Sequence, residues 1–263
     1  MKSTLEKNEV EKMTQAITEE IEKCPVCGEP LKHREGFFGS LVSVPCKCKR
    51  EKAEAEAQKK KLDALRSECF DYVKQHRETF ETDAGYNPKL TQIAKNYVAK
   101  FEQFSRKGQG LLLYGSYGCG KPFASHQIAN ALIDKEHRVR VSTFEGLHAL
   151  YRDGRSSGAF FKKLASYDLV VLDDLGAEHQ KNQMRSFVFE IINTLYEART
   201  PFIITTNLSP EALKNPTDEE ATRVYDRILE RCPCPVDATT KNIRYKIIRE
   251  AYSDYVKDIG LNL

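Results

Sequence analysis

The sequence predicts an α/β fold in which helices cover both faces of a parallel sheet, preceded by a small metal-binding module and a helical linker. Two observations predict it. From residue 108 onward, short apolar runs alternate with amphipathic stretches, as in parallel sheets buried on both faces. Ahead of this region, residues 24–48 hold two close pairs of cysteines. We therefore expect a cysteine module at 1–48, a helical linker at 49–105 and a nucleotide-binding domain at 106–263.

The composition is that of a folded protein without a membrane-spanning segment. The chain has 263 residues, of which 40% are hydrophobic and 30% charged, enough for one sizeable core and a small accessory module. Its net charge of +3 is too small to indicate nucleic-acid binding by itself, so any basic surface must be local. No apolar run approaches the roughly 18 residues that span a bilayer. The polar start lacks a secretion signal, so we expect a cytoplasmic protein with no membrane contact.

The apolar runs and their spacing predict the individual elements. Buried strands are expected at 111–115, 138–143, 168–174 and 201–207. Helices are expected at 49–76, 89–105, 123–134, 144–152, 158–166, 183–198 and 217–231. A final strand–helix unit is expected in NIRYKIIREAYSDYV, residues 242–256.

A glycine-rich segment lies between the strand at 111–115 and the helix at 123–134. It reads GSYGCGKP and fits the phosphate-binding pattern G-x-x-x-x-G-K in its usual strand–loop–helix context. Its glycines allow backbone N–H groups to converge on an anion, and the helix N-terminus adds partial positive charge. The predicted nucleotide-binding residues are Gly115, Ser116, Tyr117, Gly118, Cys119, Gly120, Lys121 and Pro122.

Pro122 departs from the pattern, which has Ser or Thr after the lysine to supply a hydroxyl ligand for magnesium. Proline is tolerated in the first turn of a helix, so the fold is preserved. Ser125 lies a turn further on and is not expected to replace the missing hydroxyl. We predict that ATP binds through the loop and Lys121, and that its hydrolysis is weakened.

Two carboxylates end the buried strand LVVLDD, at the edge where open α/β sheets bind ligands. We expect Asp173 to bind magnesium, directly or through water, and Asp174 to orient or deprotonate the attacking water. Alone, two acids after a strand would more simply indicate a turn; their place after the glycine loop favours function. Asn207, after Thr206 at the end of the next strand, is a candidate for contact with the γ-phosphate or the water.

The order of these motifs resembles the bacterial DnaC/DnaI-type helicase loaders, which share an AAA+ module with the IstB transposition ATPases. The resemblance rests on GLLLYGSYGCGKP, STFEGL, LVVLDDLGAE, FIITTNLS and TRVYDRILERC, and covers about residues 105–250. It implies an AAA+ P-loop sheet and an ATP-dependent protein that engages the replicative DNA helicase and helps place it on single-stranded DNA.

The resemblance also implies roles for individual residues. Asn207 corresponds to the sensor that follows the acidic strand, Arg227 to an arginine finger and Arg244 to a second sensor. An arginine finger acts on a neighbouring subunit's nucleotide, which implies self-assembly. Independently, Arg223, Arg227 and Arg231 are spaced to share one helical face, which a solvated face paired with glutamates would also explain.

Four cysteines, Cys24, Cys27, Cys46 and Cys48, offer thiolates in two knuckles. Four sulfur ligands suit a closed, structural zinc site, although the single-residue spacing of the second pair lowers the specificity, and His33 is an alternative ligand. The segment between the pairs is expected to form a short hairpin. Its Phe37 and Phe38 fit either a contact surface or the core of the module.

Three functions remain open from the sequence: helicase loading, an IstB-like role in transposition on duplex DNA, and a nucleotide-dependent adaptor with little hydrolysis. An N-terminal zinc module fits docking to a helicase. The basic stretch KCKREKAEAEAQKKK fits phosphate contacts or a solvated linker helix equally well.

Overall fold

The computed structural model describes residues 22–35, 40–154, 157–176, 182–216 and 218–258. The chain divides into two compact units between residues 61 and 62, inside helix α2 (Lys47–Cys69). In the first unit, β1 (Lys32–Glu35) and β2 (Ser40–Ser43) pair antiparallel, which confirms the predicted hairpin. Phe37 and Phe38 lie outside the described residues.

The second unit contains a parallel sheet in the order β4-β5-β6-β3-β7. Its strands are β3 (Leu111–Tyr114), β4 (Val139–Thr143), β5 (Leu169–Leu175), β6 (Phe202–Thr206) and β7 (Val236–Asp237). The four long strands are those that the apolar runs predict. Since all five strands are parallel, their carboxyl ends meet at one edge of the sheet.

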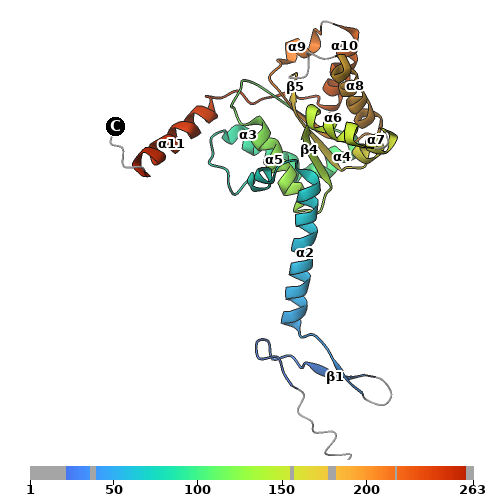
Figure 1. Cartoon of the computed structure of the whole chain (residues 1–263), viewed down its shortest axis with the longest axis vertical. Coiled ribbons are helices and arrows are strands. Elements are labelled where there is room, and N and C mark those ends of the chain that lie inside the picture. The colour runs from blue at the N-terminus through green and yellow to red at the C-terminus, as the bar shows by residue number, and fades with distance from the viewer. Residues whose placement is uncertain (1–21, 36–39, 155–156, 177–181, 217, 259–263) are drawn as a thin grey trace, which may run out of the picture. The chain divides into compact units, whose positions relative to one another are not determined.

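Helices flank the strands, while α11 extends away from them (Figure 1). These helices are η1 (Val73–Arg77), α3 (Pro88–Ala99), α4 (Phe101–Lys107), α5 (Lys121–Ile133), α6 (Phe144–Asp153), α7 (Ser157–Ala165), α8 (Asn182–Glu197), α9 (Pro210–Lys214), α10 (Glu219–Arg231) and α11 (Ile243–Asp258).

The strands are buried on both faces because successive side chains enter two different cores. Leu169 and Val171 pack in one cluster with Ile128 of α5 and with α3. Leu172, one residue on, packs in the other with Ile191 of α8 and with α6 and α10. Figure 1 shows α5 and α8 on opposite sides of the strands. The result is the predicted three-layer α/β arrangement.

The predicted strand in NIRYK is wrong. The chain is helical from Ile243, and the last strand, β7, lies earlier and has only two residues. The carboxamide oxygen of Asn242 accepts from the backbone N–H of Tyr245, and the N–H of Ile243 donates to the carbonyl of Gly118. These bonds satisfy N–H groups that a helix start leaves without partners, so helix replaces strand here.

Two predicted helices are shorter or divided. α2 ends at Cys69, before the predicted end at 76, and η1 follows. The helix predicted at 89–105 is divided into α3 and α4 at Lys100. Both pieces supply core residues of the second unit, among them Tyr97 and Phe101.

Arg140 connects the C-terminal end of α2 to the edge strand β4. It is buried, with an exposed fraction of 8%. Its guanidinium donates to the carbonyls of Glu68 and Cys69 and pairs with Asp71. The hydroxyl of Ser142 donates to the other oxygen of Asp71 at 2.6 Å. The residues that leave α2 are therefore held directly against the sheet.

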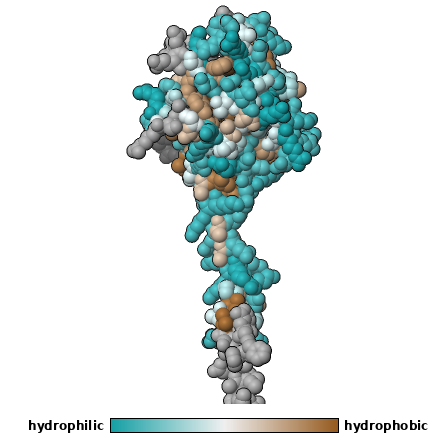
Figure 2. All heavy atoms as spheres, turned by 90° about the vertical axis from the view of Figure 1, so that its right-hand side faces the viewer, coloured by the Kyte–Doolittle hydropathy of each residue, from teal (hydrophilic) through white to brown (hydrophobic). Residues whose placement is uncertain are grey.

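No helix in the described residues is both long and apolar enough to cross a membrane. The face shown in Figure 2 is largely hydrophilic, with apolar side chains gathered over limited areas. This distribution agrees with the two buried clusters, in which most large apolar residues of the second unit are enclosed.

We predict that Arg140→Met lowers the free energy of unfolding by about 3 kcal/mol, because it leaves Asp71 and two carbonyls without their charged donor. Urea denaturation followed by circular dichroism measures the change. Arg138→Met is the matched control: the Arg138 side chain is 42% exposed and lies 3.5 Å from Glu68, so its loss should cost less than about 1 kcal/mol. Equal losses for the two variants would contradict the assignment.

Candidate functional site

The glycine loop joins β3 to α5 at the carboxyl edge of the sheet, as predicted. Gly115, Gly118 and Gly120 have φ angles of 142°, 73° and 93°, which side chains disfavour. A Cβ atom at Gly118 would lie 2.3 Å from the carboxamide oxygen of Asn242. The loop therefore requires glycine both for its conformation and for its close approach to the start of α11.

Lys121 lies across this loop and is 3% exposed. Its ammonium donates to the carbonyls of Gly115 and Ser116 at 2.8 and 2.9 Å, and to the carboxamide oxygen of Asn207 at 2.9 Å. Among the described residues no carboxylate forms an ion pair with it. A buried ammonium held by neutral oxygens is a strong site for an anion. The structure thus brings together two predicted residues 86 positions apart in the sequence.

Asp173 and Asp174 lie at an irregularity in β5, where the register with β6 shifts between Leu172 and Leu175. Asp174 has a positive φ of 62°, which is rare for a residue with a side chain and is typical of functional sites. Its backbone N–H donates to the hydroxyl of Thr205 at 3.0 Å. In a regular strand two adjacent side chains point to opposite faces, and the register shift departs from that geometry here.

Asp173 is 6% exposed, and each oxygen of its carboxylate accepts a side-chain hydrogen bond. One oxygen accepts from Thr205 at 3.1 Å, and the hydroxyl of Ser125 lies 3.4 Å from the same oxygen. The other accepts from Nε2 of His126 at 3.1 Å. With both oxygens engaged, this carboxylate has a fixed orientation.

The pKa of Asp174 is raised, first by burial and then by the neighbouring charge of Asp173. Lys121 and Arg244 act in the opposite direction, which places both cations in the electrostatic environment of Asp174. A carboxylate with a raised pKa is a better general base than an ordinary one.

The hydroxyl of Ser125 donates to the carbonyl of Pro122 at 2.8 Å and faces Asp173. Ser125 is fully buried. Its hydroxyl is thus already used inside the protein, next to the position where the usual motif would supply a magnesium ligand.

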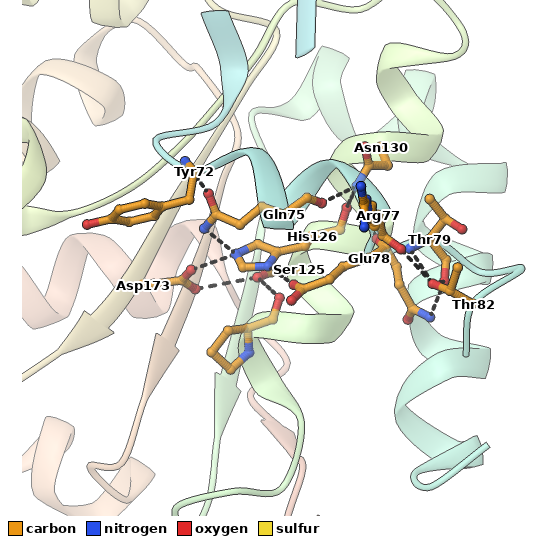
Figure 3. Close-up of polar contacts among 12 residues, drawn as sticks. Tyr72, Gln75, Arg77, Glu78, Thr79, Thr82, Ser125, His126, Asn130 and Asp173 are labelled. Atoms are coloured by element: carbon orange, nitrogen blue, oxygen red, sulfur yellow. Dashed lines mark hydrogen bonds and ion pairs between the residues drawn. The ribbon is translucent and has the colours of Figure 1, made fainter. Parts of the chain in front are cut away.

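Sequence reasoning missed His126, whose ring lies between two carboxylates (Figure 3). Nε2 contacts Asp173 and Nδ1 contacts Glu78. Burial lowers the pKa of His126, but the two carboxylates outweigh it and raise the pKa to about 9. Both acceptors require N–H donors, so the ring is the doubly protonated imidazolium. The amide of Gln75, 3.3 Å from Nε2, is then a packing neighbour of the ring.

A cavity of about 500 Å³ extends from the glycine loop to the segment that precedes α3 and to the start of α11. Its size is that of a small-ligand site. Apolar side chains also line the cavity, among them Leu90, Ile243 and Ile247, together with Tyr86. Such a surface suits a nucleobase, while the loop suits its phosphates.

The structure separates the predicted arginines. Arg244 lines the cavity. Arg227 does not: its guanidinium lies 5.2 Å from the ring of Phe189 and 5.5 Å from that of Tyr196, on the face where α10 packs against α8. Its role as an arginine finger stays a prediction.

The other two arginines of the α10 stripe have partners within the chain. Arg223 pairs with Glu219 at 2.6 Å, and Arg231 donates to the carbonyl of Tyr196 at 2.9 Å. The glutamate pairing that the spacing also allows is therefore present at Arg223.

In the first unit, Cys24, Cys27, Cys46 and Cys48 bring their sulfurs within 4.8 Å of one another. The sulfur of Cys48 lies 3.5 Å from that of Cys24 and 3.2 Å from that of Cys46. Four sulfurs bound to one tetrahedral zinc at about 2.3 Å lie about 3.8 Å apart. The cluster fits zinc, and it is the one group of metal-ligating type in the part of the chain that the structure describes.

The pKa values of two thiols in this cluster are shifted in opposite directions. Hydrogen bonds from the backbone N–H groups of Cys27 and Val26 lower the pKa of Cys24 to about 6. The pKa of Cys48 is raised to about 12, because its thiol donates to the sulfurs of Cys46 and Cys24. Zinc binds the thiolate form, so the lowered pKa of Cys24 favours ligation and Cys48 must lose its proton on binding.

The glycine loop, the acidic strand and the polar residue after β6 define a P-loop nucleotide-binding protein of the AAA+ type. The model of the IstB-like ATP binding protein family matches residues 45–251. The chain belongs to this family.

Relatives agree with the predicted resemblance. The chain is 25% identical over 253 residues to the replicative helicase loader DnaI of Bacillus subtilis (strain 168), covering 84% of this chain and 79% of the relative. Its fold is similar to a crystal structure of DnaI, with a TM-score of 0.54, 23% identity, and coverage of 66% of this chain and 94% of the other. It is also similar to a crystal structure of the DnaC helicase loader, with a TM-score of 0.51, 22% identity, and coverage of 65% and 100%.

We predict that the purified protein contains one zinc ion per chain, measured by elemental mass spectrometry, and that Cys48→Ser loses most of it. Zinc binds thiolates, so each protonated ligand must release a proton. The raised pKa of Cys48 therefore means that the apparent zinc affinity rises from pH 6 to pH 8. Cys234→Ser, at an exposed cysteine outside the cluster, should leave zinc content unchanged; equal losses in both variants would refute the site.

Proposed function

We propose that this protein is an ATP-switched replication factor that engages the replicative DNA helicase and helps place it on single-stranded DNA. Similarity to a replicative helicase loader over 84% of the chain supports this proposal. The observation that carries its ATP-dependent part is the contact between Lys121 and Asn207 beside Asp173. It joins the phosphate loop to the predicted sensor at one edge of the sheet, and the charge of Lys121 also acts on Asp174 of the acidic strand.

Lys121 supplies the positive charge for the phosphates. Its ammonium is now held by two carbonyls and Asn207. Phosphate oxygens carry charge and form stronger hydrogen bonds than carbonyls, so a bound nucleotide would exchange with these partners. Release of Asn207 from Lys121 would then report that the nucleotide is present.

Asp173 is suited to hold magnesium through water, because both of its oxygens already accept hydrogen bonds from the protein. Magnesium retains several waters in most sites, and when bound it neutralises charge on the β- and γ-phosphates. The raised pKa of Asp174 supports a role in orienting or deprotonating the attacking water. Arg244, which lines the cavity, and Asn207, which accepts from Lys121, would contact the γ-phosphate.

Self-assembly follows from the assignment of Arg227. Because Arg227 lies on the α8–α10 face and not in the cavity, it would act on the nucleotide of a neighbouring copy. The zinc module is proposed as the part that docks to the helicase. It is a separate compact unit, closed by its own four ligands.

Pro122 favours a second candidate, a nucleotide-dependent adaptor with little hydrolysis. Proline has no hydroxyl for magnesium, and Ser125 is bonded to the Pro122 carbonyl. The family name also leaves open an IstB-like role in transposition, which would act on duplex DNA.

We predict that Pro122→Thr increases the ATP turnover number roughly tenfold, equivalent to about 1.4 kcal/mol of activation free energy, because it restores a hydroxyl ligand for magnesium. Steady-state phosphate release measures the rate. Pro122→Ala is the control, since it removes the ring and supplies no hydroxyl. A rate for the threonine variant equal to that of the alanine variant would exclude the missing hydroxyl as the cause of slow hydrolysis.

We predict a stable complex with the replicative helicase of the same host in the presence of ATP, detected by size-exclusion chromatography with light scattering. Lys121→Ala should weaken its ATP dependence, and Cys24→Ser/Cys27→Ser should remove the complex by opening the zinc module. Absence of a complex in every nucleotide state would refute helicase loading. ATP-dependent binding to duplex DNA instead would favour the transposition role.

A further inference from the structure

We propose that His126 is a positioning residue for the magnesium site, and that it connects Asp173 to the junction segment, defined as residues 72–82 between α2 and α3. The proposal rests on the proposed ATP-binding function. It adds a residue outside the phosphate-binding motif, together with a physical route from the metal site to the residues that follow α2.

The first step is the position of the ring. His126 lies on α5, five residues after Lys121, and is 5% exposed. In Figure 3 its ring lies between Asp173 on one side and Glu78 on the other. The contact with Asp173 measures 3.1 Å from Nε2 to Oδ2, and Glu78 is bonded to Nδ1. One buried side chain thus contacts both the acidic strand and the junction segment.

The second step is what the contact does for Asp173. Thr205 donates to Oδ1, so among the described residues His126 is the donor that holds Oδ2. Without it, the carboxylate would lose the restraint on one of its two oxygens and could rotate. Partners that orient a metal-ligating carboxylate typically account for about 10- to 100-fold in metal affinity.

The third step is how the junction segment is held. Successive side chains of α5 bind it: Gln127 donates to the carbonyl of Thr79 at 3.2 Å, and Asn130 donates to the carbonyls of Gln75 and Glu78 at 2.9 and 3.0 Å. Neither of these two side chains contacts Asp173 in the described structure. His126 is therefore the member of this row that joins the segment to the metal site.

The fourth step is where the segment leads. It begins one residue after Asp71, which Arg140 and Ser142 fasten to β4. The amide of Gln75 is fixed in turn, because its oxygen accepts from the backbone N–H of Tyr72 at 3.0 Å. A shift of Asp173 on metal binding would thus reach the backbone that leaves α2 through a continuous set of bonded groups.

The test measures binding of a fluorescent ATP analogue, first in EDTA and then with increasing Mg²⁺, in the full-length protein. His126→Phe keeps a ring and removes both donors. We expect its affinity for the analogue in EDTA to stay within about twofold of wild type, and the Mg²⁺ concentration for half-maximal effect to rise about tenfold. Glu78 does not contact Asp173 itself. Glu78→Gln should therefore also raise the Mg²⁺ concentration for half-maximal effect, but by a smaller factor.

Asn130→Ala is the matched control. It lies one turn further along α5, is equally buried and binds the same segment, so it should lower the melting temperature without changing the Mg²⁺ dependence. If circular dichroism shows that His126→Phe does not fold, the Mg²⁺ dependence of Glu78→Gln tests the proposal instead. A wild-type Mg²⁺ dependence in the folded variants overturns the proposal. Wild-type protein that binds no analogue overturns the ATP-binding function itself, and this inference with it.

A second measurement tests the connection to the junction segment. Amide hydrogen exchange in residues 72–82 of the wild-type protein should change when Mg²⁺ is added to the ATP-bound form, and His126→Phe should lose this change. An exchange pattern in wild-type protein that does not respond to Mg²⁺ overturns the connection.

Discussion

The carboxylate of Asp173 is the group on which the arrangement of the site depends. A buried carboxylate is costly unless it is hydrogen-bonded, and its donors come from two other elements: Thr205 from β6 and His126 from α5. These bonds fix β5 against β6 at the bulge, and the helix of the phosphate loop against both. The same bonds therefore organise the sheet edge and orient the carboxylate that we propose as a magnesium ligand.

The sheet and the phosphate site were predictable because each rests on a local pattern or on topology. Strands that are buried on both faces have continuous apolar sequences. The positive φ angle and close approach of the loop at Gly118 favour glycine. Parallel strands end at one edge, so the meeting of Lys121 with Asn207 follows from their order. His126 and Glu78 are 48 residues apart and belong to no repeating pattern. Consecutive residues of α5 are buried, so no helical pattern of buried and exposed positions distinguishes His126 from its neighbours.

The arginines of α10 show that helical spacing predicts a shared face and a partner within the helix, but no partner from another element. Arg223 pairs with Glu219, one turn earlier in α10, as the spacing allows. Arg227 and Arg231 instead contact aromatic rings and backbone carbonyls of α8 and of the end of α4, whose placement depends on tertiary packing. Stacking on a ring leaves a guanidinium charged and restricts its orientation. The arginine-finger role of Arg227 would require such a restricted orientation.

We expect the proline at position 122 to change the balance between binding and hydrolysis because of what surrounds it. The loop amides and Lys121 do not depend on a hydroxyl at this position, so the proposed nucleotide binding would be retained. The nearest hydroxyl, on Ser125, is bonded to the Pro122 carbonyl and directed to Asp173, and the second oxygen of Asp173 is held by His126. Magnesium at this site would lack a hydroxyl ligand from the protein. Slow hydrolysis would prolong the ATP-bound state, which fits the ATP-switched assembly factor that we propose.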